Sequence, residues 1–220
     1  MSTSNIQIDS FLSQLRLMLS RDLPGVKAHD KMASTLKNYS SNFNHKGYSP
    51  IISAVGIFLF VENKEIHSVL IKRSEYKGYH SGQIGLPGGK MEKDDKDILY
   101  TALREAKEEI GIDINKIDNI GRLSDIYIPL SNIKVSPFVF YYKKQTPNFT
   151  IDPHEVVHLI KFPVKLLLDA KNIKREKMNY FGYNIDVPYF DIYNYHVWGA
   201  TAMILSEFVE VLKCITPELH

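Results

Sequence analysis

The pattern of apolar and polar positions along the chain predicts strands interleaved with a few helices. Residues 51–61 form a nearly continuous apolar run, which is typical of a central strand buried on both faces. Residues 66–71 predict a second strand, which ends in Lys72 and Arg73. Further strands are expected at residues 121–128, 135–142 and 156–162, and in a Tyr-rich hairpin over 177–195. Strands that alternate with helices favour an α/β or α+β fold with a mixed sheet.

Helices are predicted at both ends of the chain. Phe11, Leu15 and Met18 lie at i, i+4 and i+7, which predicts a short amphipathic helix with Ser10 as its N-cap. The C-terminal helix carries a single apolar stripe. That stripe is formed by Ile204, Phe208, Val211 and Leu212.

A third helix is predicted over residues 97–110, and it carries an unusual group of acids. Its apolar stripe consists of Leu99, Leu103, Ala106 and Ile110. At 100° per residue, Glu105, Glu108 and Glu109 project within roughly 100° of arc beside that stripe. Like charges this close repel one another. Arg104 can pair with Glu108 at i+4, but it is one cation for three carboxylates.

A divalent cation resolves this repulsion. Carboxylate oxygens on a rigid helix suit Mg²⁺ or Mn²⁺, which also bridge to substrate phosphates. The preceding loop, Pro87-Gly88-Gly89, lets backbone carbonyls approach the same cation. The alternative is a solvated acidic face, which is what two adjacent glutamates on a helix usually form.

Length, charge and cysteine content narrow the class of protein. The chain has 220 residues, enough for one sizeable domain; we interpret 1–48 as an N-terminal helical extension and 49–220 as the main domain. Lys and Arg total 27 against 25 Asp and Glu, which gives no sign of a nucleic-acid partner. The longest strongly apolar stretch, residues 54–61, is less than half a membrane span, and the N-terminus lacks the features of a signal peptide. Because the single Cys214 also suits a reducing compartment, we expect a soluble, cytoplasmic protein that binds no membrane.

The segment REAKEEIGI after a Gly-Gly loop resembles the Nudix box, G-x5-E-x7-R-E-U-x-E-E-x-G-U, in which U is aliphatic. The matches are Gly89, Arg104, Glu105, Ala106, Glu108, Glu109, Gly111 and Ile112. There are two departures. Between Gly89 and Arg104 lie 14 residues where the pattern has 13, and the internal glutamate falls on Lys96, so that Asp95 or Asp97 would have to replace it. The resemblance implies an α/β/α sandwich with a mixed sheet.

The segment before the box resembles the signature of coenzyme A pyrophosphatases, a Nudix subfamily. That signature is approximately L-L-x-x-R-S-x3-R-x-H-(A/S)-G-Q-(V/I)-x-F-P-G-G. The matches are Leu70, Arg73, Ser74, His80, Ser81, Gly82, Gln83, Ile84, Pro87, Gly88 and Gly89. The stretch from Pro188 to Leu205 also resembles this subfamily. One departure is Gly78, which stands where the signature has its second arginine, and Lys77 beside it offers only a point charge.

This resemblance implies a metal-dependent hydrolysis of coenzyme A to adenosine 3′,5′-bisphosphate and 4′-phosphopantetheine. Glu105, Glu108 and Glu109 would hold Mg²⁺ or Mn²⁺ together with the Gly89 carbonyl, and Arg104 would hold the glutamates in place. Arg73, Ser74, Lys77, His80 and Gln83 would bind the substrate. The general base stays open between Glu105 and Glu155, a residue of a later loop that is alternatively a turn carboxylate.

Other interpretations remain at this point. His80 alternatively stabilises its own loop, and the aromatic residues between 180 and 198 pack a sheet rather than stack on adenine. The same chemistry on ADP-ribose, NADH, a nucleoside triphosphate or an acyl-coenzyme A is a second hypothesis. A nucleotide-binding regulator that does not cleave its ligand is a third, although all three box carboxylates are present. Homodimers are common among proteins of this kind, and the sequence locates no interface.

Overall fold

The computed structural model describes residues 3–43, 45, 47–75, 80–143 and 146–215. The helices are α1 (Thr3–Leu19), α2 (Val26–His29), α3 (Ile98–Ile110) and α4 (Gly199–Lys213). Short 3-10 helices are η1 (Asp30–Met32), η2 (Thr35–Asn42), η3 (Ile114–Lys116), η4 (Val164–Leu167) and η5 (Ala170–Asn172). The strands are β1 (Ile51–Glu62), β2 (Glu65–Arg73), β3 (Ile84–Gly85), β4 (Gly88–Lys90), β5 (Ile117–Arg122), β6 (Ile126–Ile128), β7 (Ile133–Tyr142), β8 (Val156–Pro163), β9 (Ile173–Tyr180), β10 (Tyr183–Ile192) and β11 (Tyr195–Val197).

The larger of the two sheets is mixed, as the sequence predicts. Its strands follow the order β3-β2-β1-β7-β5, with β4 paired to β1, β6 to β7 and β8 to β2. The pair β1 and β7 is parallel, whereas the other pairs are antiparallel. The second sheet, β11-β10-β9, contains the predicted hairpin of the C-terminal third.

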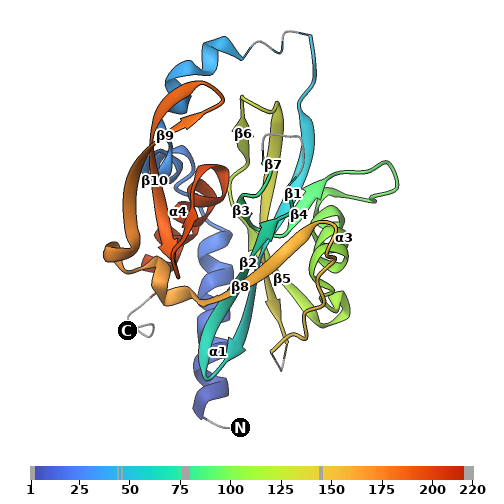
Figure 1. Ribbon diagram of the computed structural model, residues 1–220. Coiled ribbons are helices and arrows are strands. Elements are labelled where there is room, and N and C mark those ends of the chain that lie inside the picture. Colours follow the sequence, from blue (N-terminus) through green and yellow to red (C-terminus); the bar gives the residue numbers. More distant parts are fainter. Residues whose placement is uncertain (1–2, 44, 46, 76–79, 144–145, 216–220) are drawn as a thin grey trace.

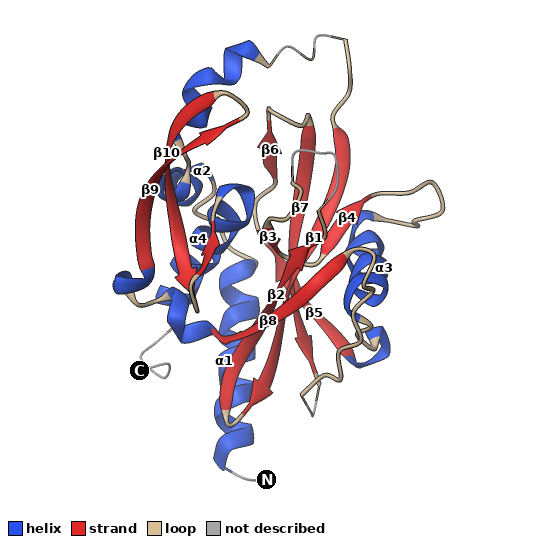
Figure 2. Ribbon diagram, in the orientation of Figure 1, coloured by secondary structure: helices blue, strands red, loops and turns tan. Residues whose placement is uncertain are grey.

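Helices cover both faces of the large sheet, so the predicted sandwich is confirmed (Figures 1 and 2). Strand β1 lies in the middle and is buried on both faces, because Ile57 and Leu59 point toward the layer of α1 and α4 while Phe58 and Phe60 point toward α3. The core therefore consists of two apolar clusters separated by the sheet. None of the helices among the described residues combines the length and apolar character that crossing a membrane requires.

Helix α3 has the boundaries that its sequence predicts. The Asp97 carboxylate caps its start by accepting a hydrogen bond from the Tyr100 N–H (2.6 Å), and Gly111 ends it in the left-handed conformation (φ 64°). Ala106 and Ile110 of the predicted stripe are buried against the sheet. The acids of α3 consequently lie along one border of the helix–sheet contact.

The N-terminal segment packs into the same core as α4. Helix α1 begins at Thr3, so the prediction of Ser10 as its N-cap was wrong: Ser10 lies inside a 17-residue helix. Phe11 and Leu15 are buried, as the predicted apolar stripe requires. The Leu19 side chain packs so closely on Gly121 of β5 that no larger residue fits there without a shift. How the chain divides into an extension and a domain stays a prediction.

Candidate active site

Three carboxylates converge beside the sheet, two from α3 and one from a distant loop. One oxygen each from Glu105, Glu109 and Glu155 lies within 4.8 Å of the others. Glu155 directly precedes β8, and its loop is fixed on α3 by the Asp152 N–H, which donates to the Glu109 carbonyl (3.1 Å). The Ser74 N–H at the end of β2 donates to the Glu155 carbonyl (2.9 Å). Pairing of β2 with β8 thus places a loop acid next to the helix acids.

Glu109 is completely buried and its carboxylate is only partly satisfied. Its Oε2 accepts a hydrogen bond from the Gly88 N–H (2.7 Å). Its Oε1 lies 3.1 Å from Nη1 of Arg73 but accepts no hydrogen bond. Burial raises the pKa of Glu109 to about 7, although Arg73 and the Gly88 N–H act in the opposite direction. A buried acceptor without a donor is a place where a bound cation would relieve a cost.

Arg73 is directed at the acids rather than into open solvent. Its Nη2 donates to the Gly88 carbonyl (2.6 Å), and its Nη1 faces Glu109. One side chain thus bridges the end of β2 to both the β4 strand and helix α3. Substrate binding by Arg73 stays a prediction, and in this geometry its first effect is to position Glu109.

Arg104 organises the solvent side of the acidic group. Its guanidinium forms a bidentate pair with Asp95 (2.8 and 3.0 Å) and contacts both Glu105 (3.0 Å) and Glu108 (2.8 Å). This pair holds the pKa of the Asp95 carboxyl far below its usual range. Of the two acids predicted as substitutes for the internal glutamate, Asp95 contacts Arg104, whereas Asp97 caps the helix; which of them takes that role stays a prediction.

Glu108 lies apart from the three converging carboxylates. Its carboxylate pairs with Arg104, and 56% of its side chain is exposed. Glu105 is more enclosed, and burial raises its pKa against the opposing effect of Arg104. Of the described carboxylates, those of Glu105, Glu109 and Glu155 form the group close enough to share one ion, whereas Glu108 would have to leave Arg104 to join them.

Gly89 brings the backbone of β4 against this group. A Cβ atom at this position would overlap the carboxylate of Glu105, so the close approach requires glycine. Its carbonyl, the predicted metal ligand, accepts a hydrogen bond from the Ser53 hydroxyl (2.6 Å).

The other predicted substrate residues lie on the far side of β4. His80 and Gln83 form a hydrogen bond with each other (Nδ1 to Oε1, 3.3 Å), and the Gln83 amide donates to the Tyr180 hydroxyl (3.0 Å). Burial lowers the pKa of His80. Ser74 contributes backbone bonds to Glu155 and Gly82, and Lys77 lies outside the described residues, as does Gly78.

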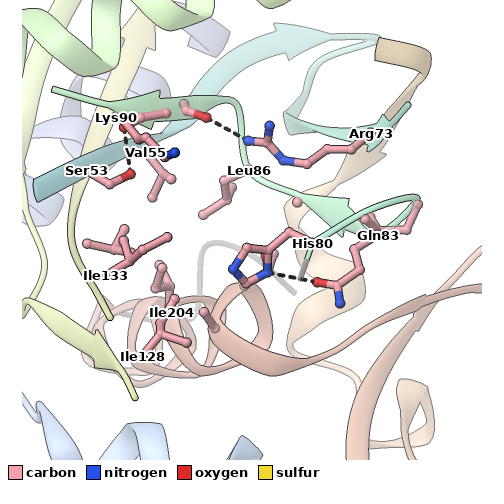
Figure 3. A pocket seen from close by; sticks show the side chains of 17 residues that line it. Ser53, Val55, Arg73, His80, Gln83, Leu86, Lys90, Ile128, Ile133 and Ile204 are labelled. Carbon is pink, nitrogen blue, oxygen red and sulfur yellow. Dashed lines mark hydrogen bonds between the residues drawn. The ribbon is translucent and has the colours of Figure 1, made fainter. Parts of the chain in front are cut away.

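A cavity of about 230 Å³ opens beside the acids on the α4 face of the sheet (Figure 3). Its polar side is formed by residues such as Arg73, His80, Gln83, Ser53 and Lys90. Its apolar side is aliphatic, formed by Val55, Leu86, Ile128, Ile133, Val135 and Ile204. Gly88 and Gly89 line it as well and separate it from the carboxylates.

The donor set fits a hard divalent cation such as Mg²⁺ or Mn²⁺. It offers carboxylate oxygens from Glu105, Glu109 and Glu155 and a nearby backbone carbonyl, with no nitrogen or sulfur ligand in the group. The Oε1 atom of Glu109 is buried, lies beside Nη1 of Arg73 and accepts no hydrogen bond from the described residues.

Comparison with known proteins decides the family. The model of the NUDIX domain matches residues 50–181, which is more than half of the chain. The chain belongs to the Nudix family. The match begins just before β1 and ends after β9, so it includes α3 and the three converging carboxylates.

Similar Nudix proteins share the sequence over about three quarters of the chain. "Nudix hydrolase 15, mitochondrial" of Arabidopsis thaliana is 35% identical over 170 residues, which are 74% of this chain and 59% of that protein. "Nudix hydrolase 22, chloroplastic" of the same plant is 35% identical over 171 residues, 75% of this chain and 56% of that protein. The chain thus spans less than two thirds of the length of these relatives. A solved MutT/nudix family protein from Enterococcus faecalis is 14% identical, with a TM-score of 0.50 over 81% of this chain and 68% of that one, and it shares the fold.

Sequence reasoning missed part of this Nudix site. The apolar wall formed by Ile128, Ile133 and Ile204 follows the same pattern as ordinary core, so no signal in the sequence separates the two. Ser53 gave no signal either, because it belongs to no recognised motif, whereas Lys90 ends the Gly88-Gly89-Lys90 stretch that resembles the subfamily. The resemblance over residues 188–205 does point to the start of α4, where Ala200 and Thr201 line the cavity.

Proposed function

We propose that this Nudix protein is a metal-dependent pyrophosphohydrolase that cleaves the diphosphate of coenzyme A or of a coenzyme A derivative. The products would be adenosine 3′,5′-bisphosphate and 4′-phosphopantetheine. The observation that carries this proposal is the position of the described residues of the segment 70–89, namely 70–75 and 80–89; the whole segment resembles coenzyme A pyrophosphatases in sequence. Of these residues, Arg73 faces Glu109, while His80 and Gln83 line the cavity.

The proposed metal site consists of Glu105, Glu109 and Glu155 with the carbonyl of Gly89. A bound Mg²⁺ or Mn²⁺ would neutralise charge on the diphosphate and acidify a water molecule. Other residues of the chain hold these carboxylates in position without the cation. Arg73 and the Gly88 N–H fix the orientation of Glu109, and Arg104 fixes that of Glu105. The family's dependence on divalent cations supports this assignment.

A carboxylate must also accept the proton of the attacking water. Glu105 and Glu155 are the two candidates, because both reach the group and each has more contact with solvent than Glu109. Glu105 is partly buried and is held by its contact with Arg104, so its carboxylate has a fixed position beside the group. Glu155 is exposed and lies in the loop before β8, so its carboxylate can contact a water molecule on the solvent side of the group.

The test is a time course of hydrolysis followed by chromatography of the products. The protein is incubated with coenzyme A or ADP-ribose at equal concentration, each with Mg²⁺, Mn²⁺ or EDTA. Glu109→Gln is compared with Glu65→Gln, a control at an exposed carboxylate that pairs with Lys165. The expected result is adenosine 3′,5′-bisphosphate from coenzyme A, formed only with metal, lost in Glu109→Gln and kept in Glu65→Gln.

Other outcomes distinguish the alternatives. Turnover of ADP-ribose alone would retain the metal chemistry and reject coenzyme A as substrate. Binding of a nucleotide that persists in EDTA and in Glu109→Gln, without any cleavage, would favour a regulator.

A further inference from the structure

We propose that the cavity of about 230 Å³ binds the pantetheine arm of coenzyme A, and that the adenosine half lies outside it. This inference rests on the proposed function and assigns the two halves of the substrate to different surfaces. A diphosphate joins the halves, so the half that enters the cavity decides which substrates reach the carboxylates.

The cavity lies directly beside the three converging carboxylates. Gly89 lines it and touches the Glu105 carboxylate with the other side of its backbone, and Arg73 lines it while facing Glu109. A group attached to a diphosphate at the carboxylates therefore has to pass the Gly88–Gly89 segment to enter the cavity. Lys90, exposed at this border, provides a positive charge for the phosphate to which that group is attached.

Size and lining favour a slender aliphatic chain. A volume of about 230 Å³ is below the roughly 300 Å³ of a pocket that holds a whole drug-sized ligand, so only part of coenzyme A fits. Ile128, Ile133 and Ile204 lie on the side opposite Arg73 and Gln83 (Figure 3). Among the described residues that line the cavity, none is Phe, Tyr or Trp, and branched aliphatic side chains give a base no flat surface for stacking.

The polar groups of the cavity match amides better than a purine edge. Gln83 is the residue whose amide would best read a base, but its Oε1 is bonded to His80 and its Nε2 to Tyr180. The Thr201 hydroxyl also lines the cavity, and so does the Ser53 hydroxyl, whose proton goes to the Gly89 carbonyl but whose oxygen can accept a hydrogen bond from an amide N–H of the arm. Neither carries charge, and the arm is neutral beyond its phosphate.

Aromatic surface lies outside the cavity, behind Gln83. Tyr180 packs edge-on against Trp198 (4.9 Å between ring centroids) and against Phe181 (4.8 Å). The Phe181 side chain is largely exposed. An adenine held outside the cavity would therefore find a stacking surface within the same region of the chain.

The experiment measures binding of each half separately in the presence of Mg²⁺. Isothermal titration gives the Kd of 4′-phosphopantetheine and of adenosine 3′,5′-bisphosphate for the wild-type chain, for Ala200→Leu and for Ala170→Leu. Ala200→Leu fills the cavity from α4, whereas Ala170 is exposed in η5 and provides the matched control. We expect Ala200→Leu to weaken 4′-phosphopantetheine about tenfold and to leave adenosine 3′,5′-bisphosphate within about twofold. The control should change neither.

A second variant keeps the test valid if Ala200→Leu does not fold. Thr201→Val removes one hydroxyl at nearly constant volume, and we expect a loss of about threefold that is confined to 4′-phosphopantetheine. Circular dichroism establishes that each variant is folded.

Each possible outcome of these titrations either supports or overturns the assignment of the cavity. A loss confined to adenosine 3′,5′-bisphosphate, equal losses for both halves, no loss, or no binding of 4′-phosphopantetheine to the wild-type chain would each overturn the proposal. Cleavage of coenzyme A with any of these results would leave the proposed function intact and reject the assignment of the cavity. Conversely, a selective loss of 4′-phosphopantetheine binding in a chain that does not cleave coenzyme A would support the cavity assignment and reject the proposed activity.

Discussion

Two buried glutamates on opposite faces of the sheet have pKa values shifted in opposite directions. Glu207 on α4 and Glu109 on α3 are both completely inaccessible to solvent. Burial alone would raise the pKa of Glu207, yet four hydrogen-bond contacts outweigh it, so its pKa is lowered. These come from the Gly25 N–H (2.8 Å), the Ser124 N–H (2.9 Å), the Ser124 hydroxyl (2.6 Å) and Nε2 of His29 (3.2 Å).

Glu109 is equally inaccessible to solvent, but fewer hydrogen-bond donors contact its carboxylate. It accepts a single hydrogen bond, from the Gly88 N–H, and burial raises its pKa to about 7. The difference shows what each carboxylate does. Glu207 ties the N-terminal segment and the β5–β6 loop to α4. Glu109 has one oxygen that accepts no hydrogen bond from the described residues, and its carboxylate lies within 4.8 Å of those of Glu105 and Glu155. A buried carboxylate with an oxygen that accepts no hydrogen bond indicates a functional site, because a purely structural site would provide donors for both oxygens.

The largest expected effect is on activity at Glu109. Glu109→Gln keeps the shape of the side chain and removes its charge, so we expect hydrolysis to fall by about 10²- to 10³-fold. The free energy of unfolding without metal should not fall, because an unfavourable buried charge is removed. Product chromatography and urea unfolding measure the two quantities. An active Glu109→Gln protein would contradict the proposed metal site.

The next effect is on stability at Glu207. Glu207→Gln places an amide N–H₂ among groups that are themselves donors, and we expect the free energy of unfolding to fall by about 3 kcal/mol. Activity of the folded fraction should change little. Equal activity loss in Glu207→Gln and Glu109→Gln would erase the contrast between the two sites.

The pH dependence of stability should separate the two glutamates as well. In the folded chain the pKa of Glu109 is raised from 4.5 to about 7, so between these values the folded state binds more protons than the unfolded state. Metal-free stability therefore falls by about 3 kcal/mol as pH rises through this window. Glu207, with its lowered pKa, contributes stability that is lost only as pH falls through that pKa.

Urea unfolding at pH 5 and pH 8 in EDTA measures this slope. Glu109→Gln should lose the component that falls with rising pH, while the wild-type chain shows it. Equal slopes in the two proteins would mean that Glu109 has an ordinary pKa.

A smaller effect is expected at Arg73. Arg73→Lys keeps the positive charge but cannot contact Glu109 and the Gly88 carbonyl with the same fork, so we expect metal affinity to fall by about 10- to 100-fold. Titration with Mn²⁺ measures this affinity without substrate. If metal affinity is unchanged and only KM for coenzyme A rises, Arg73 binds substrate, as the sequence predicts.

The smallest effect is expected at Glu108. Its carboxylate is exposed and pairs with Arg104, so Glu108→Gln should cost about 0.5 kcal/mol of stability and no more than about tenfold in activity. Hydrolysis assays and urea unfolding, with Glu109→Gln alongside, provide the comparison. A loss as large as that at Glu109 would show that Glu108 leaves Arg104 to join the metal.

The sequence indicates which of these residues matter wherever the signal is local. The apolar stripe of α3 and its extent to Ile110 follow from the spacing of apolar residues, and the family follows from a motif on consecutive turns. The error at Ser10 has the same origin. A capping residue inside a helix looks like one at its start, and the preceding turns of α1 carry no strong apolar pattern of their own.

Tertiary structure decides what each residue contacts. Helical spacing alone places Glu105, Glu108 and Glu109 together, whereas the folded chain selects Glu105 and Glu109, adds Glu155 and leaves Glu108 with Arg104. That choice depends on the pairing of β2 with β8, which are distant from the helix acids along the chain, and on the contact of Asp95 with Arg104.

The sequence by itself determined the family, the secondary structure around the acids and their chemical type, because helix periodicity, caps and motifs are properties of neighbouring residues. Only the tertiary structure decided that Arg73 faces Glu109 and that an aliphatic cavity opens beside Gly89. It also decided that, of two equally buried glutamates, Glu207 is satisfied and Glu109 is not. The physical reason is that hydrogen bonding and desolvation depend on which groups the packing of distant segments brings within a few ångströms.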